Sequence, residues 1–142
     1  MTMTSSALLA VQKALFTRLN STVLLKALVT GVFDDVPQGQ AFPYVVVGED
    51  TSSPWYSKTT EGHEVTTTIH TWSSYRGFKQ IKSIHAEIIK AITGKPFENT
   101  EGYAFMNVRM DFEEVFSEGD GVHTQSIRHG AIRFRIHVQQ IF

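Results

Sequence analysis

Histidines are the first residues of this sequence that could do chemistry, because imidazole is the commonest metal ligand in proteins. The chain has six of them, His63, His70, His85, His123, His129 and His137. Their spacing does not favour a metal site. His63 and His70 have opposite parity on one expected strand, so they would point to opposite faces, and no His-x-x-x-His or His-Glu-x-x-His pair occurs. We therefore expect histidines at the solvent or at sheet edges, and no bound metal.

Residues for nucleophilic or acid–base catalysis are equally poorly arranged. There is no Gly-x-Ser-x-Gly elbow and no phosphate-binding glycine loop, and the segment 94–96 (Gly-Lys-Pro) is better interpreted as a helix stop. Adjacent carboxylates such as Glu113 and Glu114 would point to opposite faces of a strand and would not share a site. The sequence thus predicts no enzyme activity and no cofactor.

The length and the charge of the chain limit the remaining classes of fold and function. A chain of 142 residues suits one domain, and without cysteine it has no disulfide or thiolate site. A net charge of -1 gives no general attraction to nucleic acid or to a membrane. The first ten residues lack a basic secretory segment and no apolar run approaches the ~18 residues of a membrane span, so we expect a soluble protein that is not exported.

The charges alternate in sign along the chain. Residues 1–32, 67–96 and 122–142 are net basic, whereas 33–66 and 97–121 are net acidic. Such blocks either neutralise one another within the domain, which charge alone favours, or meet across a head-to-tail contact between copies.

The elements that must position these residues follow from hydrophobic periodicity. After a cap at Ser5 or Ser6, apolar residues recur at helical spacing from Leu8 to Leu19, and 23–29 predicts a short helical turn. Residues 44–49 predict a buried strand, and 63–72 a half-buried strand with one polar face. The polar segment 50–62 between them has no period and predicts an exposed loop that carries Trp55 and Tyr56.

The second half of the chain predicts one long helix and one long hairpin. Ser73 or Ser74 would cap the helix, whose inner stripe is Phe78, Ile81, Ile84, Ile88 and Ile92. Two alternating strands then flank a turn at 118–121. The first is a long strand in which polar residues alternate with Ala104, Met106, Val108, Met110, Phe112 and Phe116. Across the hairpin, Asp111 and Glu113 could meet Arg133 and Arg135.

These elements predict an α+β fold. We expect a single mainly antiparallel β-sheet with two main helices packed on one face, ending in a long β-hairpin. The chain, 1–142, would form one domain, with 1–6 as a disordered extension or an added contact.

A succession of short motifs carries a family resemblance. The motifs are residues 33–37 (Phe-Asp-Asp-Val-Pro), 43–46 (Pro-Tyr-Val-Val), 48–50 (Gly-Glu-Asp), 72–77 (Trp-Ser-Ser-Tyr-Arg-Gly) and the arginine-rich strand from Arg128. In this order the chain resembles the tail-completion, or tail-terminator, proteins of long-tailed bacteriophages (siphoviruses), which are head-to-tail joining proteins.

The resemblance implies a structural virion protein. Such a protein forms a ring, expected to be a homohexamer, at the head-proximal end of a non-contractile tail tube. The ring stops tube growth and provides the docking face for the head-completion, or connector, protein. Its partners would be itself, the tail tube protein and the connector. Genomic DNA would pass through the channel without specific binding, no membrane would be involved, and assembly would occur in the host cytoplasm before the protein resides at the head–tail interface.

Arginine and large aromatic residues are favoured anchors of protein interfaces. We therefore expect contacts with partners at Trp55, Tyr56, Trp72, Tyr75, Arg76, Arg128, Arg133, Arg135, Glu49 and Asp50. Trp72 could equally belong to the core. Two alternatives stay open, namely a head-completion or neck connector protein, and a small metal- or ligand-binding enzyme built on the polar sheet face with its His and Thr residues.

Overall fold

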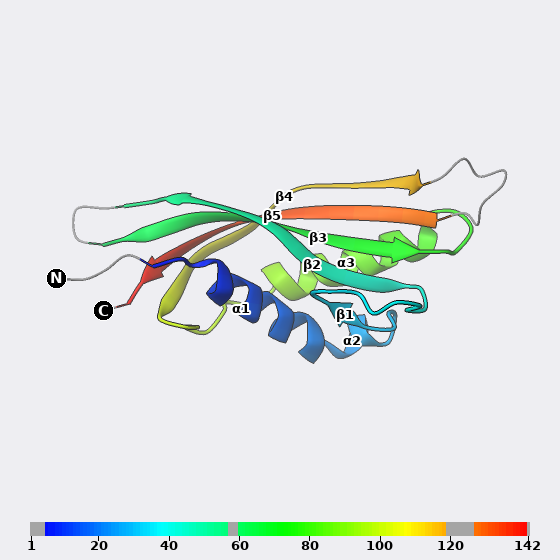
Figure 1. Cartoon of the computed structure of the whole chain (residues 1–142), viewed down its shortest axis with the longest axis horizontal. Coiled ribbons are helices and arrows are strands. Elements are labelled where there is room, and N and C mark those ends of the chain that lie inside the picture. The colour runs from blue at the N-terminus through cyan, green and yellow to red at the C-terminus, as the bar shows by residue number, and fades with distance from the viewer. Residues whose placement is uncertain (1–4, 57–59, 119–126, 142) are drawn as a thin grey trace.

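A five-stranded sheet forms the centre of the protein. The computed structural model describes residues 5–56, 60–118 and 127–141. The strands are β1 (Val32–Phe33), β2 (Tyr44–Pro54), β3 (Gly62–Ser73), β4 (Tyr103–Glu118) and β5 (Ile127–Gln140), in the spatial order β1-β2-β3-β5-β4. The pair β1–β2 is parallel and the other three pairs are antiparallel. The long strands run along the length of the molecule (Figure 1).

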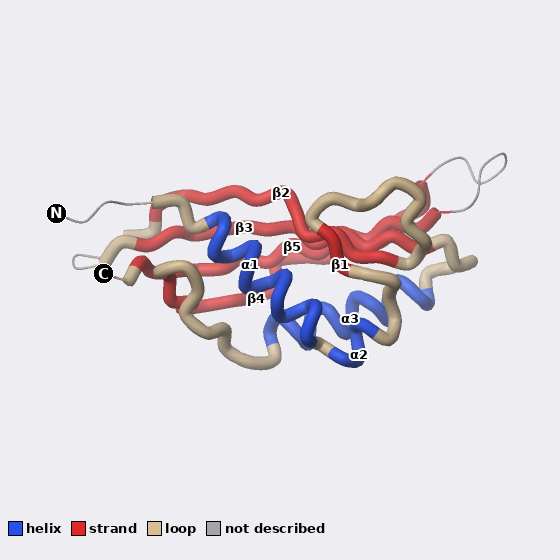
Figure 2. The backbone as a smooth tube through the Cα atoms, turned by 60° about the horizontal axis from the view of Figure 1, so that its bottom comes forward, coloured by secondary structure: helices blue, strands red, loops and turns tan. Residues whose placement is uncertain are grey.

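The helices all lie on one side of this sheet (Figure 2). They are α1 (Leu8–Ser21), α2 (Val23–Lys26) and α3 (Lys79–Thr93). The predicted α+β fold with one mainly antiparallel sheet, two main helices on one face and a long hairpin is confirmed. Among the described residues, no helix is long and apolar enough to cross a membrane. In the part of the chain that the structure describes, the other side of the sheet bears no helix.

The core lies between the helices and the sheet. Ala10, Val11, Leu15 and Leu19 of α1 and Ile84, Ile88 and Ile92 of α3 are buried against the central strands. β5 contributes alternate residues to this layer, Ile132, Phe134, Ile136 and Val138, all fully buried. Each such side chain stabilises the fold by roughly 1.5–3 kcal/mol through the apolar surface it removes from water.

The predicted loop 50–62 is wrong over its first part, because β2 continues to Pro54. A bulge at Glu49, with φ of 57°, shifts the register, and Asp50 to Pro54 then pair with Thr67 to His63. Most side chains of this segment are exposed. A strand with little burial on either face has no apolar alternation, so its polar sequence indicated a loop. Only 55–61 connects β2 to β3, and 57–59 lie outside the described residues.

The long strand predicted before the turn is present as β4, but its alternating apolar residues do not share one face. Two register shifts, between Phe105 and Asn107 and between Met110 and Phe112, reverse the alternation. Phe112 and Phe116 consequently pair with Arg133 and His129 on the helix-free face. Each bulge adds one residue, and one extra residue moves every later side chain to the opposite face. The turn predicted at 118–121 lies outside the described residues beyond Glu118.

The predicted helix caps differ in detail from the structure. α1 begins after Ala7, and the Ser6 hydroxyl accepts a hydrogen bond from the Leu8 amide at 3.3 Å. Before α3, Ser73 ends β3 instead of capping the helix, because the turn through Gly77, with φ of 80°, delays the helix to Lys79. Phe78 therefore precedes the helix and is only half-buried. Of the predicted extension 1–6, residues 1–4 are outside the described part, and Ser5 bonds the Tyr103 hydroxyl.

Candidate interaction surface

The helix-free side of the sheet carries most of the polar residues that the sequence singled out. We call it the open face. On β3 it comprises Glu64, Thr66, Thr68, His70 and Trp72. The partners of these residues on β5 are His137, Arg135, Arg133, Ala131 and His129, in that order. On β4, Phe112, Glu114 and Phe116 continue the same face. Directly paired residues share a face of a sheet, so these side chains are neighbours.

One end of the open face holds an ion-pair network around Arg135. Its guanidinium donates to Glu64 Oε1 at 2.8 Å and to Asp111 Oδ2 at 2.9 Å. His137 Nε2 donates to Glu64 Oε2 at 2.9 Å, and the Trp55 ring lies 4.6 Å from the His137 ring. The hydrogen bond from His137 and the charge of Arg135 lower the pKa of Glu64, and Arg135 lowers the pKa of Asp111. Both carboxyls stay ionised, and the predicted Asp111–Arg135 pair is confirmed.

The other end holds two histidines in contact. His70 Nδ1 lies 2.8 Å from His129 Nε2, and their outer nitrogens meet Glu49 at 3.1 Å and Glu118 at 2.9 Å. The Trp72 ring stacks on His129 with a centroid distance of 3.8 Å. Burial lowers the pKa of His70, and the nearby Glu49 opposes this effect. Trp72 therefore lies on the open face and not in the core.

On the helix side, His85 is buried, with 2 % of its surface exposed. Its Nε2 accepts from the Thr71 hydroxyl at 2.7 Å, and its Nδ1 donates to Glu113 at 2.9 Å. Burial lowers the pKa of His85, so the ring is neutral, which suits these two bonds. The expectation of solvent or edge histidines is wrong here, because strand residues from β3 and β4 satisfy the ring. Glu113 accordingly does not meet Arg133.

The ten predicted contact residues do not form one site. Trp55 and Tyr56 follow β2, with 43 % and 58 % exposure, whereas Tyr75 and Arg76 are exposed at the opposite end, between β3 and α3. Arg135 and Asp50 already have partners within the chain. Arg135 pairs with Glu64, and Asp50 accepts a hydrogen bond from the Thr67 hydroxyl. The remaining four lie on or beside the sheet. Glu49 and Trp72 belong to the histidine cluster, Arg128 lies over Phe78 and exposed Arg133 over Phe112.

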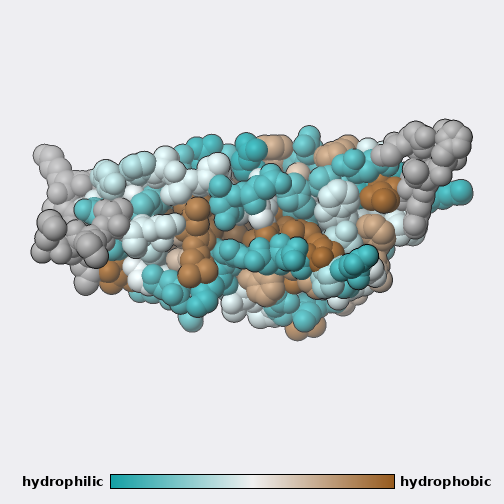
Figure 3. Space-filling view, viewed as in Figure 1, coloured by the Kyte–Doolittle hydropathy of each residue, from teal (hydrophilic) through white to brown (hydrophobic). Residues whose placement is uncertain are grey.

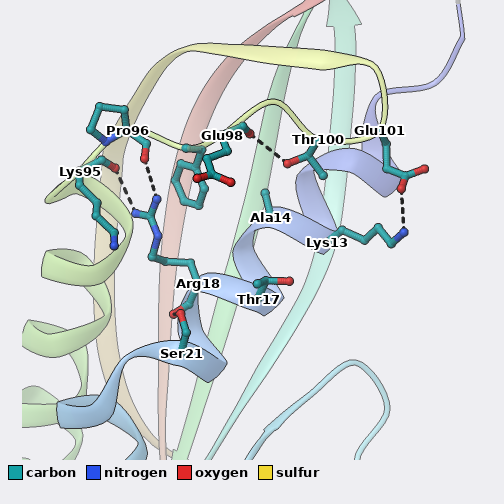
Figure 4. Close-up of a pocket in the computed structure, with 11 residues that line it drawn as sticks. Lys13, Ala14, Thr17, Arg18, Ser21, Lys95, Pro96, Glu98, Thr100 and Glu101 are labelled. Carbon is teal, nitrogen blue, oxygen red and sulfur yellow. Dashed lines mark hydrogen bonds and ion pairs between the residues drawn. The ribbon is translucent and has the colours of Figure 1, made fainter.

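A groove on the helix side has a structural explanation. It encloses about 460 Å³ between α1 and the segment that follows α3 (Figure 4). Arg18 spans it and donates to the carbonyls of Ala91 at 2.8 Å, Lys95 at 3.1 Å and Pro96 at 2.8 Å. Its guanidinium also lies 3.8 Å from the Phe97 ring centroid. Sequence reasoning missed this residue, because its partners are backbone atoms more than seventy positions away.

Both edges of the sheet are unpaired over long stretches. Among the residues that the structure describes, β4 pairs only with β5 and β1 reaches only Val45 and Val46, so β2 from Gly48 onward has one strand neighbour. The surface seen in Figure 3 is mainly hydrophilic, with hydrophobic side chains in separate groups. Large exposed apolar side chains on β4 are Met106, Met110, Phe112 and Phe116. An unpaired edge of this kind is a template for another strand.

In the described residues, no three His, Asp or Glu side chains are placed to hold a metal ion. The open face offers strand edges, aromatic rings and paired charges, which suit protein contacts.

Residues 13–139 match the family model of tail completion protein gp17. The chain belongs to this family.

Individual relatives agree with that assignment. Tail completion protein gp17 of Bacillus phage SPP1 is 29 % identical over 126 residues, which cover 89 % of this chain and 90 % of that protein. The solved structure of SPP1 gp17 has a TM-score of 0.64, covering 92 % of this chain and 89 % of its own.

A second solved structure is more similar in backbone. A chain in the virion of a native gene transfer agent particle is 25 % identical and has a TM-score of 0.82, covering 96 % of this chain and 99 % of its own. As a tail completion protein, the chain is a structural component of a phage virion and not an enzyme. The metal- or ligand-binding enzyme alternative is thereby excluded.

Proposed function

We propose that copies of this chain form a ring that caps the head-proximal end of a non-contractile tail tube. The ring, a hexamer in this proposal, stops tube growth and presents the docking face for the head connector. It is assembled in the host cytoplasm and stays at the head–tail interface, and DNA passes through it without specific binding. Membership of the tail completion family supports the proposal, as does the similarity to a chain of a virion particle.

The observation that carries the ring is the pair of free sheet edges. Because β2–β3, β3–β5 and β5–β4 are all antiparallel, β4 runs opposite to β2. Rotation about an axis along the strands keeps these directions, so β4 of one copy meets β2 of the next as an antiparallel neighbour. This is a head-to-tail contact that closes into a ring and leaves no free edge. It would also bury Met106, which is 53 % exposed on β4.

Such a ring has two chemically different faces, as a protein between tube and head requires. The strand ends with Trp55 and Tyr56 would form one face, and those with Tyr75 and Arg76 the other. Arg133 remains a candidate for the contact between copies, because it is exposed. Arg135 is a weaker candidate, since Glu64 and Asp111 already neutralise it.

Electron microscopy of isolated partners tests the function. The purified chain is added to tail tubes that lack their cap, and separately to heads with exposed portals. Rings confined to one tube end are expected. Rings found only on head portals would overturn the proposal in favour of a neck connector.

The ring contact needs its own variants. Met106→Ser removes an exposed side chain from the β4 edge, and Leu24→Ser removes one that is 64 % exposed on α2. Both variants should fold, because neither side chain is in the core. Met106→Ser should weaken ring formation on tubes while Leu24→Ser leaves it unchanged. Equal rings from Met106→Ser and Leu24→Ser would refute the edge contact. Unchanged rings from Arg133→Glu combined with Arg135→Glu would exclude these two arginines from the contact between copies.

A further inference from the structure

Four side chains form one continuous hydrogen-bonded chain across the open face. Glu49 of β2, His70 of β3, His129 of β5 and Glu118 of β4 follow one another, so every long strand contributes one residue. The three links measure 3.1, 2.8 and 2.9 Å between heavy atoms. All are within hydrogen-bonding distance, and all four imidazole nitrogens are used.

A proton count shows what three simultaneous hydrogen bonds along this row of side chains require. A carboxylate only accepts, so His70 Nε2 and His129 Nδ1 must both carry hydrogen to bond Glu49 and Glu118. The link between the two rings needs one further hydrogen, on either His70 Nδ1 or His129 Nε2. Three N–H groups are therefore required, whereas two neutral imidazoles supply only two. With both carboxylates ionised, the three links can therefore exist together only when the two rings share one positive charge.

The surroundings suit a single shared charge. His129 lies between the Trp72 ring at 3.8 Å and the Phe116 ring at 4.7 Å, and an aromatic face stabilises an adjacent cation. Of the described residues, the charged groups on this part of the open face are Glu49 from β2, Glu114 and Glu118 from β4, and Arg133 from β5. A second positive charge would place two N–H groups against each other across the 2.8 Å link.

We propose that Glu49, His70, His129 and Glu118 form a pH-operated clasp, which ties the four long strands together while it holds one excess proton and opens at the His70–His129 link when it takes a second. The inference does not depend on the capping function. Burial lowers the pKa of His70 and so opposes a charge on that ring, and we expect the second proton only at acidic pH. Opening frees the end of the β4–β5 pair that lies nearest Glu118 and Ile127.

Imidazole ¹⁵N NMR of the whole chain counts these protons directly. At neutral pH we expect three N–H groups on the two rings, and a fourth on acidification. Glu118→Gln should reduce the neutral-pH count to two, because an amide does not hold the imidazolium. Glu114→Gln, on the same strand and face, should leave it at three. Two N–H groups in the unaltered protein, or three in Glu118→Gln, would overturn the clasp.

Amide hydrogen exchange of the whole chain tests the opening itself. After correction for the intrinsic pH effect, acidification should reduce protection about tenfold near Glu118 and Ile127, the loss expected for one charge-assisted hydrogen bond. Protection near Tyr103 and Gln140, at the far end of the same strands, should not change. An equal loss at both ends, or none at either, would contradict the proposal.

Discussion

Gly130 should tolerate no side chain, because the histidine pocket under β5 fills the space beside it. A Cβ built on Gly130 would meet His85 Nε2 and Thr71 Oγ1 inside contact distance. These two atoms are the buried partners of one hydrogen bond, so neither can move without losing the other. Gly130→Ala must therefore displace a buried polar pair, and glycine here is a packing requirement.

The magnitude follows from two effects. Overpacking a buried site costs about 1–3 kcal/mol. Stranding a buried donor or acceptor costs a further ~1–3 kcal/mol. We expect Gly130→Ala to lower the free energy of unfolding by about 3 kcal/mol, or roughly 10 °C in Tm for a chain of this size. Gly48→Ala is the matched control, since nothing lies within 4 Å of its Cβ position. It should change stability by less than ~1 kcal/mol.

Urea unfolding followed by circular dichroism measures both variants, provided that the slope of the transition is unchanged. Repeating Gly130→Ala in a His85→Ala background tests the cause, because the substitution should then cost far less. The reasoning is refuted if Gly130→Ala is as stable as Gly48→Ala, or if removing the histidine does not reduce its cost.

Three further variants examine the core, the groove and the buried histidine. Phe134→Ala should lower the free energy of unfolding, measured in urea, by about 3–5 kcal/mol, because it leaves a cavity in the core beside β5. Arg18→Lys should cost about 2 kcal/mol in the same assay, since an ammonium cannot reproduce the fork to three carbonyls; no loss would show that the fork is dispensable. Burial lowers the pKa of His85, so the unfolded chain takes the proton first and unfolding free energy should fall as pH drops below about 6.5. His85→Gln should show a smaller fall between pH 7 and 5; an identical pH profile would contradict this assignment.

The sequence predicted the parts of the fold that depend on clear periodicity. The stripe from Ile81 to Ile92 and the alternation from Ile132 to Val138 each have one face against the core, so their patterns were sufficient. The sequence also predicted β4 as a long strand, but the faces of its side chains could not be predicted because it is an edge strand with two bulges. Phe112 has the same parity as Met110 in sequence, but the bulge between them turns it to the open face.

Of the contacts on the open face, the sequence predicted only a pair between two strands that follow each other along the chain. Asp111 and Arg135 were expected to meet because both lie on one hairpin. His85 could not be placed, since its partners Thr71 and Glu113 come from two other strands. The hydrogen-bonded row of Glu49, His70, His129 and Glu118 likewise depends on the order in which four strands pair. No single sequence motif predicts that order.

The central claim is that this chain ends tail-tube growth, and tube length measures it most directly. Tube protein is polymerised with increasing amounts of the chain, and tubes are imaged by electron microscopy. The account predicts that elongation stops early, that shorter tubes accumulate, and that each carries a ring at one end. Tubes that reach full length with the chain bound along their sides, or not bound at all, would contradict it.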